Sequence, residues 1–93
     1  VGHLEIDIIS ASAEGIHFVE VKTRCENIQA PPQENVDHTK QRRIASAAKG
    51  FLRSKKGLPF YGSECHFDVV AITLKTNTTQ VEYFHDAFIP IYL

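Results

Sequence analysis

The chain has 93 residues, which is enough for one domain, spanning residues 1–93, and too few for two. Apolar residues make up 43% of it and charged residues 23%, which is typical of a globular protein and argues against a disordered or fibrous chain. No apolar run approaches the roughly 20 residues that a membrane span needs, and a net charge of −1 argues against a general polyanion binder.

The charges are unevenly distributed along the chain. All eleven carboxylates lie outside residues 39–63, whereas that segment carries seven of the ten basic side chains. These seven are Lys40, Arg42, Arg43, Lys49, Arg53, Lys55 and Lys56. The asymmetry predicts one cationic surface on an acidic body.

Two strands are predicted at the start of the chain, over residues 3–10 (HLEIDIIS) and 16–24 (IHFVEVKTR). Both are rich in Ile, Val and Phe and are interrupted by charged residues. The link between them, ASAEG, is short and ends in Gly15, so we expect an antiparallel hairpin.

A helix is predicted next, over residues 36–56, after a proline-containing loop that ends at Asn35, a candidate N-cap. Its apolar residues recur with helical spacing, and Gly57 with Pro59 should end it. The apolar stripe consists of Ile44, Ala47, Ala48, Phe51 and Leu52.

Two further strands are predicted over residues 64–75 and 80–88. The first is apolar on both faces near its middle, which favours a central position covered on both sides. The order strand–strand–helix–strand–strand predicts a mixed α/β domain, in which a four-stranded mixed sheet carries a helix on one face. An upstream helix would cover the other face. Since the first strand begins almost at once, we expect such a segment to be missing from this sequence.

Charged side chains in the first two strands should form a cluster. Glu5 and Asp7 project to one face of the first strand, and Glu20 and Lys22 share a face of the second. A register that sets Asp7 opposite Glu20 also sets Glu5 opposite Lys22, with Cβ atoms about 4.5–5.5 Å apart. Because carboxylates at this distance repel each other, one must be protonated, paired with Lys22 or bridged by a cation.

A hard dication, Mg²⁺ or Mn²⁺, fits this cluster because it prefers carboxylate and carbonyl oxygens. We expect Asp7, Glu20 and the backbone carbonyl of Val21 as ligands, with Glu5 as a further candidate. Such an ion activates water for phosphodiester cleavage, and Lys22 would orient that water or stabilise the transition state. A cross-strand salt bridge on a solvated hairpin face explains the same pattern equally well.

The segments LEIDIIS, IHFVEVKTR, HTKQRRIASAAKGFL and CHFDVVAI together resemble the YraN-like family of small bacterial proteins. The resemblance covers nearly the whole chain, and EID followed by FVEVKTR is its most specific part. That family is similar to the PD-(D/E)XK superfamily of restriction endonucleases and Holliday junction resolvases. The resemblance implies a restriction-endonuclease-like core, with Asp7 and Glu20 as metal ligands and Lys22 as the catalytic lysine. The chain departs from the family pattern at Cys65 and His66, where members tend to have arginine.

Three basic residues are candidate nucleic-acid contacts. Lys40 lies in angular line with Ile44, so it should point towards the sheet and contact a substrate phosphate, unless it is a snorkelling lysine at the rim of the core. Arg43 and Arg24 are the other two, and ion pairs are the alternative for both. The stripe of Arg42, Lys49, Arg53 and Lys56 is either a solvated face or a surface that follows phosphates.

The remaining ionisable residues carry weaker signals. Cys25 and Cys65 are not spaced as in zinc sites, and neither are the five histidines, so we expect reduced thiols and isolated imidazoles in a cytoplasmic protein. The histidines are His3, His17, His38, His66 and His85. Asp68, in an apolar strand, should support Lys40 or the metal site, or pair with Arg43 or His66.

The sequence therefore predicts a metal-dependent endonuclease that hydrolyses DNA phosphodiester bonds, at branched or structured DNA and with a homodimer as a candidate assembly. Nothing in it resembles a base-reading element, so shape and backbone should select the substrate. The alternative is a non-catalytic module that binds nucleic acid or protein on a nuclease scaffold. A structural protein whose cationic helix docks onto an acidic partner is a third reading.

Overall fold

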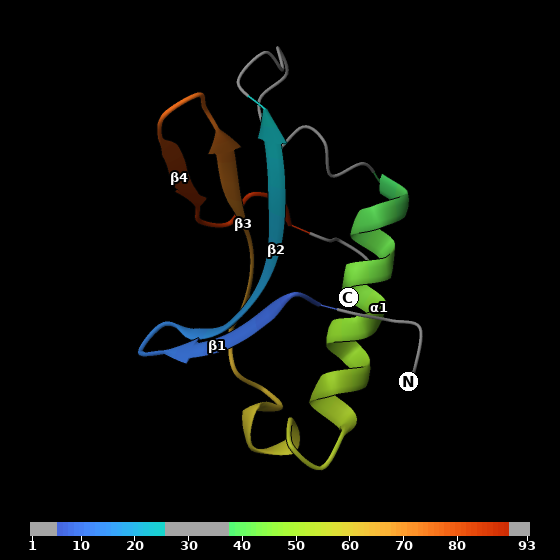
Figure 1. Cartoon of the computed structure of the whole chain (residues 1–93). Helices are drawn as coiled ribbons and strands as arrows, with labels where there is room; N and C mark the ends of the chain where they lie inside the picture. Colours follow the sequence, from blue (N-terminus) through green and yellow to red (C-terminus); the bar gives the residue numbers. More distant parts are fainter. Residues whose placement is uncertain (1–5, 26–37, 90–93) are drawn as a thin grey trace.

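The computed structural model describes residues 6–25 and 38–89. Within them, four strands form one sheet in the order β1-β2-β3-β4, and helix α1 lies against one face of it (Figure 1). The elements are β1 (Ile8–Ser12), β2 (Gly15–Cys25), α1 (His38–Arg53), the short 3-10 helix η2 (Leu58–Phe60), β3 (Cys65–Leu74) and β4 (Thr79–Phe84). β2 pairs antiparallel with β1 and parallel with β3, and β3 pairs antiparallel with β4. The predicted mixed sheet with one helix is confirmed in element order and in kind.

The β1–β2 hairpin is tighter than predicted. Ser12 pairs with Gly15, so the strands extend into the predicted link and leave a turn of two residues. Gly15 makes this possible, because its φ is +135° and a Cβ there would lie 2.2 Å from the carbonyl oxygen of Glu64. That carbonyl also accepts the N–H of Ile16 at 2.8 Å, which joins the hairpin to the start of β3.

The core lies between α1 and the face of the sheet that carries Phe18. Because strand side chains alternate, Ile16 and Phe18 of β2 point to this face, and the parallel register sets Phe18 beside Phe67 of β3. The two phenyl rings stack with their centroids 5.4 Å apart. From α1, Ile44 and Ala48 close the same cluster, so the predicted apolar stripe of the helix does face the sheet.

Three predicted element ends are wrong for local reasons. The helix ends at Arg53 rather than near residue 56, because the Ser54 hydroxyl donates to the Phe51 carbonyl. β1 begins at Ile8, since the chain bends at Asp7. β4 ends at Phe84, because Asp86 takes a φ of 50° and donates its N–H to the Asp68 carboxylate at 2.8 Å. The expected N-cap Asn35 and residues 1–5 lie outside the described residues.

The sheet face opposite α1 is polar near the start of β2 and β3. It carries the buried side chains of His17, His66 and Asp68. β3 lies inside the sheet, as predicted. On the face away from α1, however, the buried residues near its start are His66 and Asp68 rather than apolar residues. In the described part of the chain, no helix is both long and apolar enough to cross a membrane.

Candidate active site

Asp7 lies beside β2 where the hairpin pairing begins. The register pairs Ile8 with Val19, and one further step sets Asp7 opposite Glu20. The bend at Asp7 turns its side chain towards the neighbouring backbone, and Oδ2 accepts the N–H of Val21 at 2.9 Å. The Asp7 carboxylate therefore lies against the stretch of β2 that carries Glu20 and Lys22.

Glu20 is at the centre of a small cluster of charges. Its Oε2 lies 2.7 Å from Nζ of Lys40 and 3.6 Å from Nζ of Lys22. Lys22 is on the same face of β2, two residues along, whereas Lys40 comes from the first turn of α1. The Glu20 side chain is only 12% exposed, so these two amines, rather than water, stabilise its negative charge.

The two lysines do not share the carboxylate equally. Burial lowers the pKa of Lys22, and the adjacent ammonium of Lys40 lowers it further. The hydrogen bond to Glu20 raises the pKa of Lys40, with a smaller contribution from the negative charge of Asp7. Lys40 is thus the fixed cation of the cluster, and Lys22 is the amine that loses its proton more readily.

Three oxygen-bearing groups can hold a hard metal ion here. In an extended strand, the N–H and C=O of one residue point towards the same neighbour. Since the Val21 N–H points to Asp7, the Val21 carbonyl faces the same edge, just beyond the first paired residue of β1. With the carboxylates of Asp7 and Glu20, this donor set consists of oxygen alone and suits Mg²⁺ or Mn²⁺.

The other candidate residues are placed differently. Arg24 continues the row of Glu20 and Lys22 along the same face of β2, and Arg43 is exposed on α1. Glu5 lies outside the described residues. Asp68 is on the opposite face of the sheet, paired in register with Val19, so the prediction that it supports Lys40 or the metal site is wrong.

The histidines are the group whose arrangement the sequence did not reveal. His17, His66 and His85 meet on the face opposite α1, so the expectation of isolated imidazoles is wrong. Part of the arrangement could be predicted: His17 precedes Phe18 and His66 precedes Phe67, so strand alternation places each histidine on the face away from the phenylalanine. The sequence does not predict the parallel register that sets His17 beside His66.

The fold and the site together define a small α/β domain with acidic and lysine side chains clustered at the edge of a central strand. The chain belongs to the uncharacterised protein family UPF0102, which it matches over residues 1–72. The predicted resemblance to the YraN-like family of small bacterial proteins is thereby confirmed.

Relatives across bacteria match most of this chain. It is 42% identical over 86 residues to a UPF0102 protein of Clostridium perfringens (strain 13 / Type A), covering 90% of this chain and 68% of that protein. It is also 42% identical over 86 residues to one from Moorella thermoacetica, with 90% and 69% covered. A UPF0102 protein of Nitratidesulfovibrio vulgaris (strain DP4) is 36% identical over 87 residues, with 94% and 63% covered. The chain thus spans about two thirds of the length of these relatives.

Proposed function

We propose that this chain carries the active site of an endonuclease that uses Mg²⁺ or Mn²⁺ to hydrolyse DNA phosphodiester bonds. The observation that supports it is the convergence of Asp7, Glu20 and Lys22 around the Val21 peptide. A plain hairpin salt bridge needs only one carboxylate and one amine. Here a second carboxylate, from the bend just before β1, accepts a hydrogen bond from the same backbone.

The residues have distinct parts in this proposal. Asp7, Glu20 and the Val21 carbonyl would hold the ion, which supplies an activated water and neutralises charge on a phosphate oxygen. Lys22, whose pKa is lowered by burial and by Lys40, would position that water and stabilise charge in the transition state.

Lys40 has a second role once Glu20 binds metal. At present its ammonium lies 2.7 Å from the Glu20 carboxylate. When that carboxylate binds an ion instead, the Lys40 ammonium would still lie beside the site and would contact a substrate phosphate. Arg24 on β2 and Arg43 on α1 would extend the contact along a DNA backbone, selected by shape rather than sequence.

The second candidate function is a binding module without catalysis. The observation that favours it is that the Glu20 carboxylate already has two ammonium groups as partners, those of Lys40 and Lys22, so its charge needs no metal ion. Branched or structured DNA would then be bound through phosphates and left intact. The two functions differ in what Lys22 does, so a variant of that residue separates them.

The test is cleavage of branched, single-stranded and duplex DNA by the purified protein with Mg²⁺ or Mn²⁺. We expect Lys22→Ala to lower the cleavage rate by about 100-fold or more, as removal of one transition-state donor does. The matched control is Lys75→Ala, an exposed lysine in the turn after β3, which should cleave normally. DNA binding without cleavage that survives Lys22→Ala would instead establish the binding module.

A further inference from the structure

A second cluster of ionisable side chains lies on the face of the sheet opposite α1. His17 comes from β2, His66 from β3, and His85 directly follows β4. The ring centroids of His17 and His66 are 4.8 Å apart, those of His66 and His85 5.0 Å, and those of His17 and His85 5.6 Å. Imidazoles this close have no role in the proposed active site, which lies on the other face of β2.

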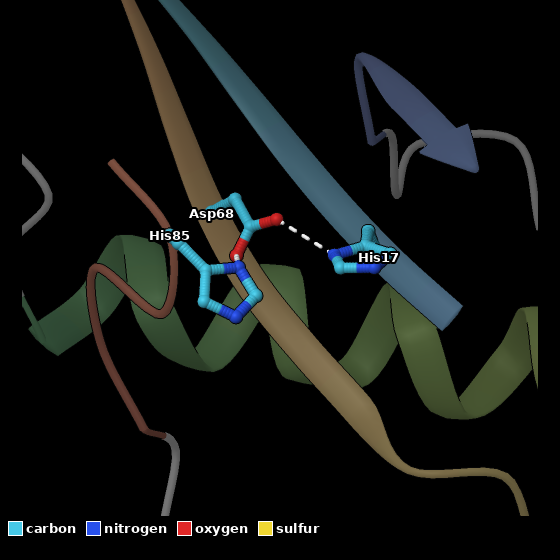
Figure 2. Close-up of side chains that lie close together, drawn as sticks. All are labelled: His17, Asp68 and His85. Carbon is cyan, nitrogen blue, oxygen red and sulfur yellow. Dashed lines mark hydrogen bonds and ion pairs between the residues drawn. The ribbon is translucent and has the colours of Figure 1, made fainter. Parts of the chain in front are cut away.

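Asp68 lies between two of these histidines, as Figure 2 shows. Its Oδ2 is 2.9 Å from Nδ1 of His17, and its Oδ1 is 3.5 Å from Nδ1 of His85. The Asp68 side chain has no exposed surface. Although burial acts in the opposite direction, hydrogen bonds from Tyr83, the Asp86 N–H and His17 lower the pKa of Asp68. A buried charged carboxylate is therefore held between two imidazole nitrogens.

This donor set has the composition and size of a transition-metal site. The candidate ligand atoms of His17, Asp68 and His85 all lie within 4.8 Å of one another. Zn²⁺ binds imidazole nitrogen and carboxylate oxygen at about 2.0–2.2 Å, so ligand atoms in a tetrahedral site are about 3.4 Å apart. Binding an ion would draw these atoms, now within 4.8 Å of one another, to that closer spacing. Two nitrogen ligands also favour zinc-like ions over Mg²⁺.

The far nitrogen of each proposed histidine ligand already has a partner. Nε2 of His17 lies 2.8 Å from Oγ of Ser12, and Nε2 of His85 lies 3.2 Å from Oδ2 of Asp86. Metal-bound histidines almost always donate their second N–H to such an acceptor, which fixes the tautomer and the ring orientation. Both rings are therefore held with Nδ1 towards Asp68, and the ion would displace the Nδ1 proton that His17 now donates to that carboxylate.

His66 is placed as a support and not as a ligand. Its Nδ1 lies 2.9 Å from Oδ1 of Asp86, and its Nε2 lies 3.2 Å from the carbonyl oxygen of Glu14. Since both nitrogens already face acceptors, neither is directed at Asp68. His66 instead holds Asp86, which in turn contacts His85.

We propose that His17, Asp68 and His85 bind one zinc-like divalent transition-metal ion, independently of the proposed nuclease site. The His85 side chain is 42% exposed, so the ion would be reached from solvent and would keep a water as its fourth ligand. Its ligands come from β2, β3 and the residue after β4. The ion would thus fasten three parts of the sheet on the face that α1 does not cover.

The test is titration of the purified protein with Zn²⁺ by calorimetry and with Co²⁺ by visible absorption. We expect one equivalent to bind, with visible Co²⁺ bands of high intensity that report a four-coordinate site. His85→Ala should weaken binding by at least about 100-fold, since even loss of an outer-shell partner typically costs 10–100-fold. His85 is half-exposed, so this variant should fold normally, and His17→Gln provides a second substitution.

Two controls make the result decisive. His38→Ala, an exposed histidine at the start of α1, and Glu20→Gln, on the other face, should bind Zn²⁺ as tightly as the unaltered protein. Absence of stoichiometric binding would overturn the proposal, as would binding that survives both His85→Ala and His17→Gln. Loss of binding in His66→Gln but not in His17→Gln would also overturn it, because the overlapping set of His66, His85 and Asp86 would then be the site.

Discussion

Glu20 shows at the scale of one residue how a half-buried charge is stabilised by its neighbours. Both amines that contact its carboxylate do so through the same oxygen, Oε2. The ammonium groups of Lys22 and Lys40 are therefore held close together and repel each other. This repulsion adds to the effect of burial and lowers the pKa of Lys22.

This arrangement predicts how the pKa of Lys22 responds to loss of its neighbour. In the metal-free protein, Lys40→Met removes the cation that, after burial, does most to lower the Lys22 pKa. Lys22 then keeps Glu20 as a partner without the repulsion of the Lys40 ammonium, so the pKa of Lys22 should rise. An NMR titration of the lysine side chains measures it, and Lys49→Met, further along α1, should leave it unchanged. An unchanged value in Lys40→Met would mean that the two amines do not interact.

The two cysteines should differ in reactivity. Burial raises the pKa of the Cys65 thiol, and its Sγ lies 3.7 Å from the Ser63 carbonyl oxygen, to which it donates. Cys25 is exposed at the end of β2. Because the thiolate is the reacting form, iodoacetamide at neutral pH should modify Cys25 before Cys65. Peptide mass spectrometry at successive times measures the two modification rates. Equal rates would show that Cys65 is more open than its burial indicates.

Strand alternation in the sequence is sufficient to group some of the site residues. Glu20 and Lys22 are two apart in a strand, so they must share a face. The approach of Lys40 to the sheet follows from its angular position on the helix. The histidine cluster cannot be derived in this way, because it depends on the parallel register of β2 with β3 and on the turn after β4.

At the scale of elements, glycines fix where the chain changes direction. A Cβ at Gly57 would lie 1.8 Å from the Phe51 carbonyl oxygen, so the chain after α1 passes too close to the helix end for any other residue. Gly50, within the same helix, has open space around its Cβ position. The two glycines therefore make opposite predictions for the same substitution.

Gly50→Ala should raise the free energy of unfolding by about 0.5–1 kcal/mol, because alanine loses less backbone entropy in a helix. Gly57→Ala should lower it by about 2 kcal/mol or more, since the backbone of the helix end must move. Urea denaturation followed by circular dichroism measures both changes. Stabilisation by Gly57→Ala would contradict the close approach of this turn to Phe51.

Element type is more predictable than element length. All four strands and the helix follow from their apolar residues, although only β2, β3 and α1 bury a face in the core and every residue of β1 is exposed. The predicted ends are misplaced where side chains bind the backbone: Ser54 at the end of α1, Asp7 before β1, and Asp68 where β4 stops. Such contacts depend on tertiary neighbours that a local pattern does not contain.

At the scale of the whole molecule, β2 links the core to both candidate sites. One row of its side chains enters the core through Ile16 and Phe18 and then reaches the candidate active site at Glu20. The alternate row carries His17 into the cluster on the other face. A loss of packing under β2 should therefore affect both sites, since both depend on the position of one strand.

Phe18→Ala tests this dependence on the core. The side chain is 1% exposed and its ring stacks on Phe67, so truncation should lower the free energy of unfolding by about 3–5 kcal/mol. That is a large part of the total of about 5–15 kcal/mol that typical domains have. Val81→Ala, at a position 62% exposed on β4, should stay within about 0.5 kcal/mol of the unaltered protein. If urea midpoints showed the two variants to be equally stable, the Phe18 ring would not be part of a close-packed core, and the sheet would have to be held in place by contacts other than those with α1.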